Sequence, residues 1–187
     1  ELPKYWTDVH SMTISYGHGI STTPLQFATA VAALVNGGFA IHPTFLKIPK
    51  EGREKSRKRL LSADTSDRIR YLMRRNVIAG TGKSAAVPGY RVGGKTGSAE
   101  KVIGGKYDTN ALLTSFVGIF PADKPAYLTF IMLDEPQAEA HKKSRPTAGQ
   151  NATIVTARLI NRIGPMLGVV PAKEFTTSFD EILRSPY

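Results

Sequence analysis

Residues 90–133 read YRVGGKTGSAEKVIGGKYDTNALLTSFVGIFPADKPAYLTFIML, and this stretch decides the fold. Its apolar and β-branched runs predict strands at residues 90–99, 112–120 and 126–133. Gly104-Gly105 is typical of a hairpin connection, and the segment PADKP at 121–125 is typical of a turn. Connections this short join antiparallel strands, so the stretch predicts a three-stranded antiparallel meander.

A helix is predicted on the N-terminal side of the meander. Thr23 is a suitable N-cap, Pro24 suits the first helical position, and Gln26 completes a capping box. The apolar residues that follow extend to Asn36-Gly37-Gly38, where the helix is expected to end. Because this helix is apolar on nearly all sides, the sequence predicts that it is buried.

Two further helices are expected. One covers about residues 64–77, with Ile69, Leu72 and Met73 on its apolar face, and the other covers about residues 151–166. Residues 1–21 show little periodicity and contain the loop-like segment YGHG at 16–19. Together these elements predict an α+β fold, in which an antiparallel sheet packs against helices.

The composition is that of an ordinary globular protein. The chain has 187 residues, of which 41% are hydrophobic and 21% charged, which argues against disordered, collagen-like and coiled-coil structures. No apolar run approaches the ~20 residues that span a bilayer. The sequence has no cysteine, which excludes disulfides and thiol catalysis, and its four histidines lack metal-ligand spacing. We therefore expect neither a metal nor a cofactor.

The charge leaves a second functional class open. The chain carries 25 basic and 15 acidic residues, for a formal net charge of +10, and residues 47–75 are its most basic part. A non-enzymatic basic module that binds nucleic acid or an anionic surface is therefore an alternative. The most basic run, residues 50–59, contains no aromatic residue that would stack on bases, which favours a solvated loop.

Two short motifs match known signatures in the wrong context. The segment GTGKS at residues 80–84 follows a predicted helix and precedes a strand, whereas a phosphate-binding loop needs the reverse order. Ser98 and Lys101 have the Ser-x-x-Lys spacing of serine acyltransferases, which places both residues on one face only in a helix. Since Ser98 lies on or at the end of a predicted strand, this match is interpreted as accidental.

Lys95-Thr96-Gly97 lies within a predicted strand and is followed by Ser98. Lys-Thr-Gly on an antiparallel strand is one of the signatures of β-lactamases and penicillin-binding proteins. The simpler alternative is a solvent-exposed lysine that protects a sheet edge from pairing. The tripeptide alone is a weak signal, so the residues around it decide between these interpretations.

The surrounding sequence resembles class B penicillin-binding proteins, and among them the division-specific peptidoglycan D,D-transpeptidases. Residues 80–82 and 89–99 are similar to the family's approach to its Lys-Thr-Gly motif. Residues 15–19, 22–26 and 36–38 are similar to its loop and buried helix, and residues 116–121 (FVGIFP) resemble its next strand. The resemblance extends over about residues 12–169.

The resemblance implies acyl transfer on a D-Ala-D-Ala stem peptide. A serine attacks the penultimate carbonyl, D-alanine leaves, and an amine of a neighbouring stem accepts the acyl group. Lys95 and Thr96 would hold the substrate carboxylate, Gly97 would admit the substrate backbone, and the Ser98 N–H would donate to the oxyanion. Catalytic roles are thus expected for Lys95, Thr96 and Ser98, and substrate contacts for all four residues. The substrate would add to this strand, which requires a free sheet edge.

The chain departs from the family pattern in one respect. The nucleophilic Ser-x-x-Lys and the Ser-x-Asn motif precede Lys-Thr-Gly in the family, and this chain has neither before residue 95. We therefore expect residues 1–170 to be the C-terminal part of a penicillin-binding transpeptidase domain, inactive alone, followed by a tail at 171–187. The nucleophile, the membrane anchor and a non-catalytic module are expected outside the chain, which would act at the periplasmic face of the bacterial inner membrane.

The resemblance also implies partners. They are peptidoglycan stem peptides, β-lactam antibiotics, the N-terminal part of the same transpeptidase domain, and other cell-division and cell-wall synthesis proteins, but not nucleic acid. One geometric difficulty concerns the site itself. Strict alternation along a strand puts Lys95 and Thr96 on opposite faces, so a twist or bulge between them is predicted if both serve one site.

Overall fold

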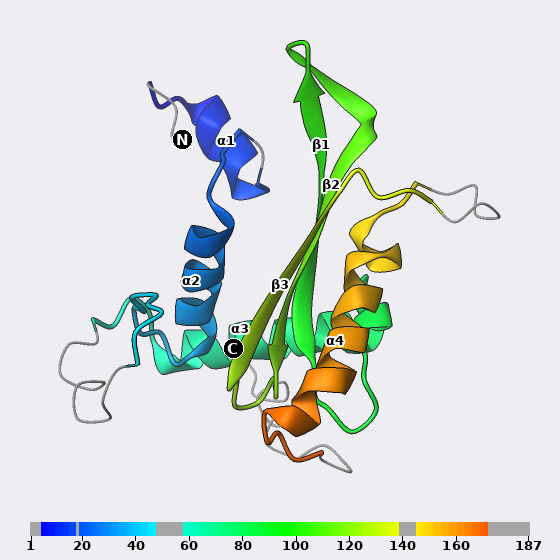
Figure 1. The fold of residues 1–187 in the computed structure, drawn as a ribbon. Helices are drawn as coiled ribbons and strands as arrows, with labels where there is room; N and C mark the ends of the chain where they lie inside the picture. The colour runs from blue at the N-terminus through cyan, green and yellow to red at the C-terminus, as the bar shows by residue number, and fades with distance from the viewer. Residues whose placement is uncertain (1–4, 18, 48–57, 139–144, 172–187) are drawn as a thin grey trace.

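The computed structural model describes residues 5–17, 19–47, 58–138 and 145–171. Its antiparallel sheet has the strand order β1-β2-β3, with β1 at Gly93–Ile103, β2 at Lys106–Phe120 and β3 at Tyr127–Asp134. Figure 1 shows the sheet between helices on both sides. The predicted meander and the predicted α+β class are confirmed.

The helices cover the two faces and one end of the sheet. Helix α2 lies on one face and helix α4 on the other, while α3 crosses the sheet close to the start of β1 (Figure 1). The bounds of the α-helices and of two short 3-10 helices are α1 Asp8–Ser15, α2 Pro24–Val35, α3 Ala63–Ala79, η2 Lys83–Ala85, η3 Ala148–Gln150 and α4 Ala152–Met166.

Strand β2 is apolar on both faces because both faces are covered. Phe116 and Phe120 belong to a buried cluster with Ile160 of α4, whereas Val117 and Ile119 belong to a cluster on the side of α2. Successive residues of a strand point to opposite faces, so the continuous apolar run from residue 116 to 120 supplies both clusters. This two-sided burial fixes the sheet between α2 and α4.

Strands β1 and β2 extend further toward their hairpin than the sequence predicted. Their pairing continues to Ile103 and Lys106, beyond the predicted ends at residues 99 and 112. Gly104 and Gly105 form the connection, and both have positive φ angles, of 60° and 79°. A two-residue hairpin turn of this kind requires positive φ at both positions, which glycine adopts at low cost.

Several expectations about the helices need correction. A short helix, α1, occupies part of the predicted loop, and Thr7 and His10 form its capping box.

Helix α2 has the predicted Thr23–Gln26 capping box but is not buried on all sides, since Leu25 is 58% exposed. Leu72 of α3 is 64% exposed, because α3 turns Met73 rather than Leu72 toward the sheet. The helix predicted at 151–166 is confirmed as α4, which contains Pro165 near its end.

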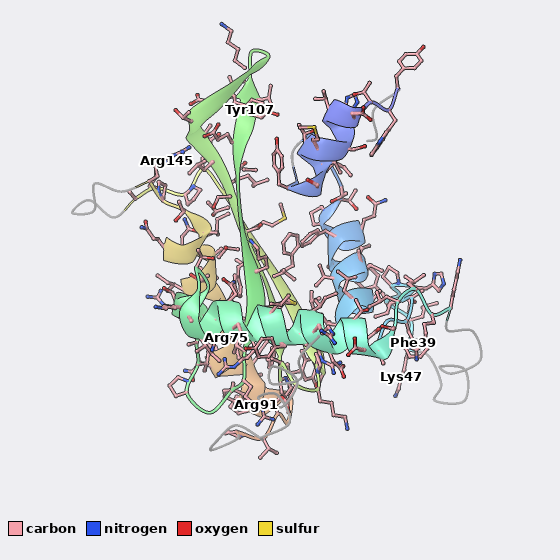
Figure 2. All side chains as sticks on the ribbon, turned by 180° about the vertical axis from the view of Figure 1, so that it is seen from behind. Phe39, Lys47, Arg75, Arg91, Tyr107 and Arg145 are labelled. Atoms are coloured by element: carbon pink, nitrogen blue, oxygen red, sulfur yellow. The ribbon has the colours of Figure 1, made fainter. Side chains whose placement is uncertain are left out.

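The start of β1 is joined to the β2–β3 turn by an ion pair. Arg91 donates through Nε to Asp123 Oδ1 at 2.8 Å and through Nη2 to Oδ2 at 2.6 Å, and the Ala122 N–H donates to the Arg91 carbonyl. Figure 2 shows Arg91 at the end of the sheet opposite the hairpin. Both side chains of the pair are only about one fifth exposed, 20% and 22%, so water screens the pair weakly.

We predict that Asp123→Asn lowers the free energy of unfolding by about 1–2 kcal/mol, because it removes one charge from a bidentate pair. Denaturant unfolding of the protein measures this change. Asp134→Asn is the matched control, since Asp134 is 67% exposed in its pair with Lys101 and exposed pairs contribute little. Equal effects of the two substitutions would contradict the prediction.

Candidate active site on the outer edge of β1

The outer side of β1 carries the predicted site residues. Within the described ranges no strand pairs with this side, since β1 is the first strand in the sheet order. The Gly94 carbonyl accepts a hydrogen bond from Asn76 Nδ2 at 2.8 Å, and the Thr96 carbonyl accepts one from Lys95 Nζ at 2.7 Å. Both carbonyls therefore point away from β2. Backbone direction alternates along a strand, so the Ser98 N–H shares this edge, as an oxyanion donor to an added ligand requires.

Lys95 and Thr96 lie on opposite faces of the sheet. The sequence predicted a twist or a bulge between them, and no bulge is present at this position. Lys95 is paired with Val117 of the α2-side cluster and Thr96 with Phe116 of the α4-side cluster, while the register shift lies at Glu100/Lys101. The exposed Lys95 side chain instead reaches the strand's own outer edge, where its ammonium meets the Thr96 carbonyl. The length of the lysine side chain thus brings the ammonium to the outer edge of β1 without a bulge.

The Thr96 side chain contacts the turn that follows helix α3. Its Oγ1 lies 2.7 Å from Thr81 Oγ1, in the turn between α3 and η2. That turn follows a helix and leads to a strand, the order that argued against a phosphate-binding loop. The turn is held by hydrogen bonds, because the Asn76 carbonyl accepts from the N–H groups of Gly80 and Gly82.

Ser98 and Lys101 do not form a nucleophile–base pair. Ser98 Oγ accepts a hydrogen bond from the Ala148 N–H at 3.1 Å, which ties β1 to η3. Lys101 Nζ donates to Asp134 at 3.0 Å and to Glu135 at 2.7 Å. These hydrogen bonds raise the pKa of Lys101, so its ammonium stays protonated and is a poor base. The interpretation of this Ser-x-x-Lys match as accidental agrees with the geometry.

The two glycines beside Lys95 differ in how tightly they are packed. A Cβ on Gly97 would approach only Ser115 Oγ, at 2.7 Å, and a hydroxyl of that kind can rotate away. A Cβ on Gly94 would lie 2.2 Å from the Phe116 ring and 2.5 Å from the Val117 carbonyl. Gly94 is therefore required by the packing of the sheet, whereas Gly97 leaves space next to the free edge.

A groove of about 430 Å³ opens beside the second half of β1. One wall is Ser98, Ala99 and Glu100, and the opposite wall is the loop that follows α1, with Tyr16 and Gly17. Tyr107 closes the groove near the hairpin, and Figure 2 shows it in the upper part of that hairpin. The sequence indicated the YGHG segment as loop-like and by its resemblance, but no local pattern indicates that this loop meets β1.

The hairpin end of β1 is held by charged side chains across the register shift. Arg145 donates to Glu100 at 3.0 Å and also to the Thr109 carbonyl, while Lys101 spans to the end of β3. Figure 2 shows Arg145 alongside the hairpin, on the side away from α1. Residues 139–144, which precede Arg145, lie outside the described residues, as does most of the basic run at 50–59.

Comparison with known proteins agrees with this geometry. The sequence model of the penicillin binding protein transpeptidase domain matches residues 1–153. The probable peptidoglycan D,D-transpeptidase FtsI of Caulobacter vibrioides is 39% identical over 184 residues, which cover 94% of this chain and 31% of that protein. The chain spans less than a third of the length of that protein, and 26% of the length of a second relative, the stage V sporulation protein D of Bacillus subtilis.

Solved structures show the same fold. The transpeptidase domain of penicillin-binding protein 3 from Burkholderia pseudomallei, in its apo form, has a TM-score of 0.80 at 32% identity, over 90% of this chain and 49% of that chain. Penicillin-binding protein 3 from Mycobacterium tuberculosis, complexed with ampicillin, has a TM-score of 0.67 at 29% identity, over 84% and 38%. The outer edge of β1 bears Lys-Thr-Gly and pairs with no strand of the described residues, the sheet lies between two layers of helices, and the family model matches most of the sequence. The chain therefore belongs to the penicillin-binding protein transpeptidase domain family.

Proposed function

We propose that this chain is part of a peptidoglycan D,D-transpeptidase, which cross-links stem peptides and is acylated by β-lactams. The observation that carries the proposal is the outer edge of β1, where the Lys95 ammonium, the Thr96 hydroxyl and the Ser98 N–H lie within four consecutive residues. An extended peptide ending in a carboxylate needs a strand edge for its backbone and a cation with a hydroxyl for its terminus.

Each residue has a distinct part in the proposed reaction. A serine from the remainder of the domain attacks the penultimate carbonyl of the donor stem, and the C–N bond to D-alanine breaks as that residue leaves. Lys95 and Thr96 bind the terminal carboxylate and so orient the carbonyl, and the Ser98 N–H stabilises the developing oxyanion. Gly97 leaves room for the donor backbone. An amine of a neighbouring stem then displaces the serine and forms the cross-link.

The proposal includes the organisation inferred from the sequence. Residues 1–170 would complete a domain whose nucleophile lies in another segment, and residues 171–187 would be a tail. The protein would act on the periplasmic side of the inner membrane, with other cell-wall synthesis proteins. Among the described residues, every helix is too short or too polar to span a bilayer. β-Lactam binding is supported by the ampicillin complex of the similar Mycobacterium tuberculosis protein.

Labelling of the intact parent protein with a fluorescent penicillin tests the proposed function. We expect a covalent band that survives denaturation and is prevented by excess unlabelled benzylpenicillin. A DNA gel shift at several salt concentrations, run on the same preparation, tests the alternative suggested by the net charge. Absence of labelling together with salt-sensitive DNA binding would overturn the proposal in favour of a basic binding module.

A further inference from the structure

Four polar groups form a chain behind the candidate carboxylate site. Asn76 Nδ2 donates to the Gly94 carbonyl at 2.8 Å, Thr81 Oγ1 donates to Asn76 Oδ1 at 3.2 Å, and Thr81 Oγ1 lies 2.7 Å from Thr96 Oγ1. Asn76 belongs to helix α3 and Thr81 to the turn after it, so these hydrogen bonds join the end of α3 to β1. None of these contacts is predicted by a local sequence pattern.

The donor and acceptor in each of these hydrogen bonds can be assigned by counting protons. The Gly94 carbonyl can only accept, so the amide group of Asn76 must face it with Nδ2 and must turn Oδ1 toward Thr81. A threonine hydroxyl has one proton, and Thr81 gives its proton to Asn76 Oδ1. The 2.7 Å contact between the two hydroxyls therefore requires Thr96 to donate and Thr81 to accept. In this arrangement the only proton of Thr96 is not available to a ligand.

The Thr81 hydroxyl is held where it can change partners. The Asn76 carbonyl accepts from the N–H groups of Gly80 and Gly82 on either side of Thr81, which fixes the turn. A Cβ on Gly149 would come within 2.8 Å of the Thr81 carbonyl, so the turn also lies close against η3. Thr81 is itself exposed, and rotation of its hydroxyl proton needs no movement of the backbone.

We propose that Thr81 is a positioning residue for carboxylate recognition, an inference that rests on the proposed function. When a ligand carboxylate accepts the proton of Thr96, the Thr81 hydroxyl rotates and donates to Thr96 Oγ1 instead of to Asn76. The number of hydrogen bonds made by the two hydroxyls stays the same, but one of them is now charge-assisted and stronger. A hydroxyl that accepts a hydrogen bond also becomes a better donor, so Thr81 strengthens the contact between Thr96 and the carboxylate.

The test compares three variants of the intact parent protein with two ligands. Thr81→Val keeps the shape and removes the hydroxyl, Thr81→Ser keeps the hydroxyl, and Ser84→Ala removes an exposed hydroxyl from the neighbouring η2 helix as a matched control. The acylation rate constant is measured with benzylpenicillin, which has the carboxylate, and with its methyl ester, which has no charge there. Thermal unfolding of each variant checks that the fold is retained.

We expect Thr81→Val to slow acylation by benzylpenicillin by about fivefold to tenfold, the size of one lost hydrogen bond between neutral groups. The rate with the methyl ester should change by less than about twofold. Thr81→Ser should restore the benzylpenicillin rate, and Ser84→Ala should leave it unchanged.

Two outcomes would overturn the inference. If Thr81→Val slows both ligands equally, Thr81 has only a structural role in β1, and if it slows neither, Thr81 does not assist Thr96. Failure of the proposed function has a different signature, because the unsubstituted parent protein would then not be acylated by benzylpenicillin.

Discussion

Replacing Gly94 with alanine should cost about 3 kcal/mol or more of the free energy of unfolding, the upper end of the range for overpacking a core. The added methyl group would lie 2.2 Å from the fully buried Phe116 ring and 2.5 Å from the Val117 carbonyl, and neither neighbour can move freely. Gly94 does not have the positive φ that favours glycine, so the cost comes from space and not from backbone strain. Denaturant unfolding of the protein, or the loss of soluble protein, measures the effect.

Gly97→Ala is the matched control for this prediction. It places the same methyl group three residues along the same strand, where its near neighbour is the rotatable Ser115 hydroxyl. We expect Gly97→Ala to change the unfolding free energy by less than about 1 kcal/mol. A Gly94→Ala protein that unfolds at the same denaturant concentration as the Gly97→Ala protein would show that the packing around Gly94 is looser than described.

Lys95→Ala should reduce acylation of the intact parent protein by benzylpenicillin by about a hundredfold or more, in the range found when one preorganised polar group is removed from a catalytic site. Lys95 is exposed and forms no ion pair among the described residues, so its removal should leave the unfolding free energy nearly unchanged. The measurement is the rate constant for acylation, followed with a fluorescent penicillin.

Lys124→Ala removes the same charge from the β2–β3 turn and serves as the control for net charge. Its acylation rate should equal that of the unsubstituted protein. If Lys95→Ala and Lys124→Ala have the same small effect, then Lys95 only protects the sheet edge from pairing with other strands, which is the simpler alternative that the sequence left open.

Local signals account for the parts of the fold that the sequence predicted. The Gly104-Gly105 connection, the PADKP turn and the Thr23–Gln26 capping box each require particular residue types within a few positions, and all three are present in the structure. Helix α1 was missed because its capping box uses His10 where glutamate or glutamine is typical. The strand ends near the hairpin were missed because their residues pair without being buried.

The candidate site was predictable only in part, for a related reason. The motif on β1 could be located by its sequence and by the family resemblance. Its surroundings depend on contacts between residues far apart in the chain: Thr81 with Thr96, Ser98 with Ala148, and the loop after α1 with the groove. The sequence also does not show that the Lys95 ammonium reaches the edge, because alternation along a strand predicts the direction of the Cβ and not the position of the end of a long side chain.

The two-sided burial of β2 has a consequence for the specificity of folding. In a sheet with one solvent-exposed face, a one-residue slip of a strand moves its hydrophobic residues into solvent. The free-energy cost of that exposure selects the correct register. This penalty does not select the register of β2 between residues 116 and 120, because both faces of the strand would still be apolar after a slip. Steric fit must select the register instead, because the Phe116 ring packs into the space left by the missing side chain of Gly94 and a slip would remove it from that space. The absence of a side chain at Gly94 thereby helps to set the register of the strand that carries Lys95.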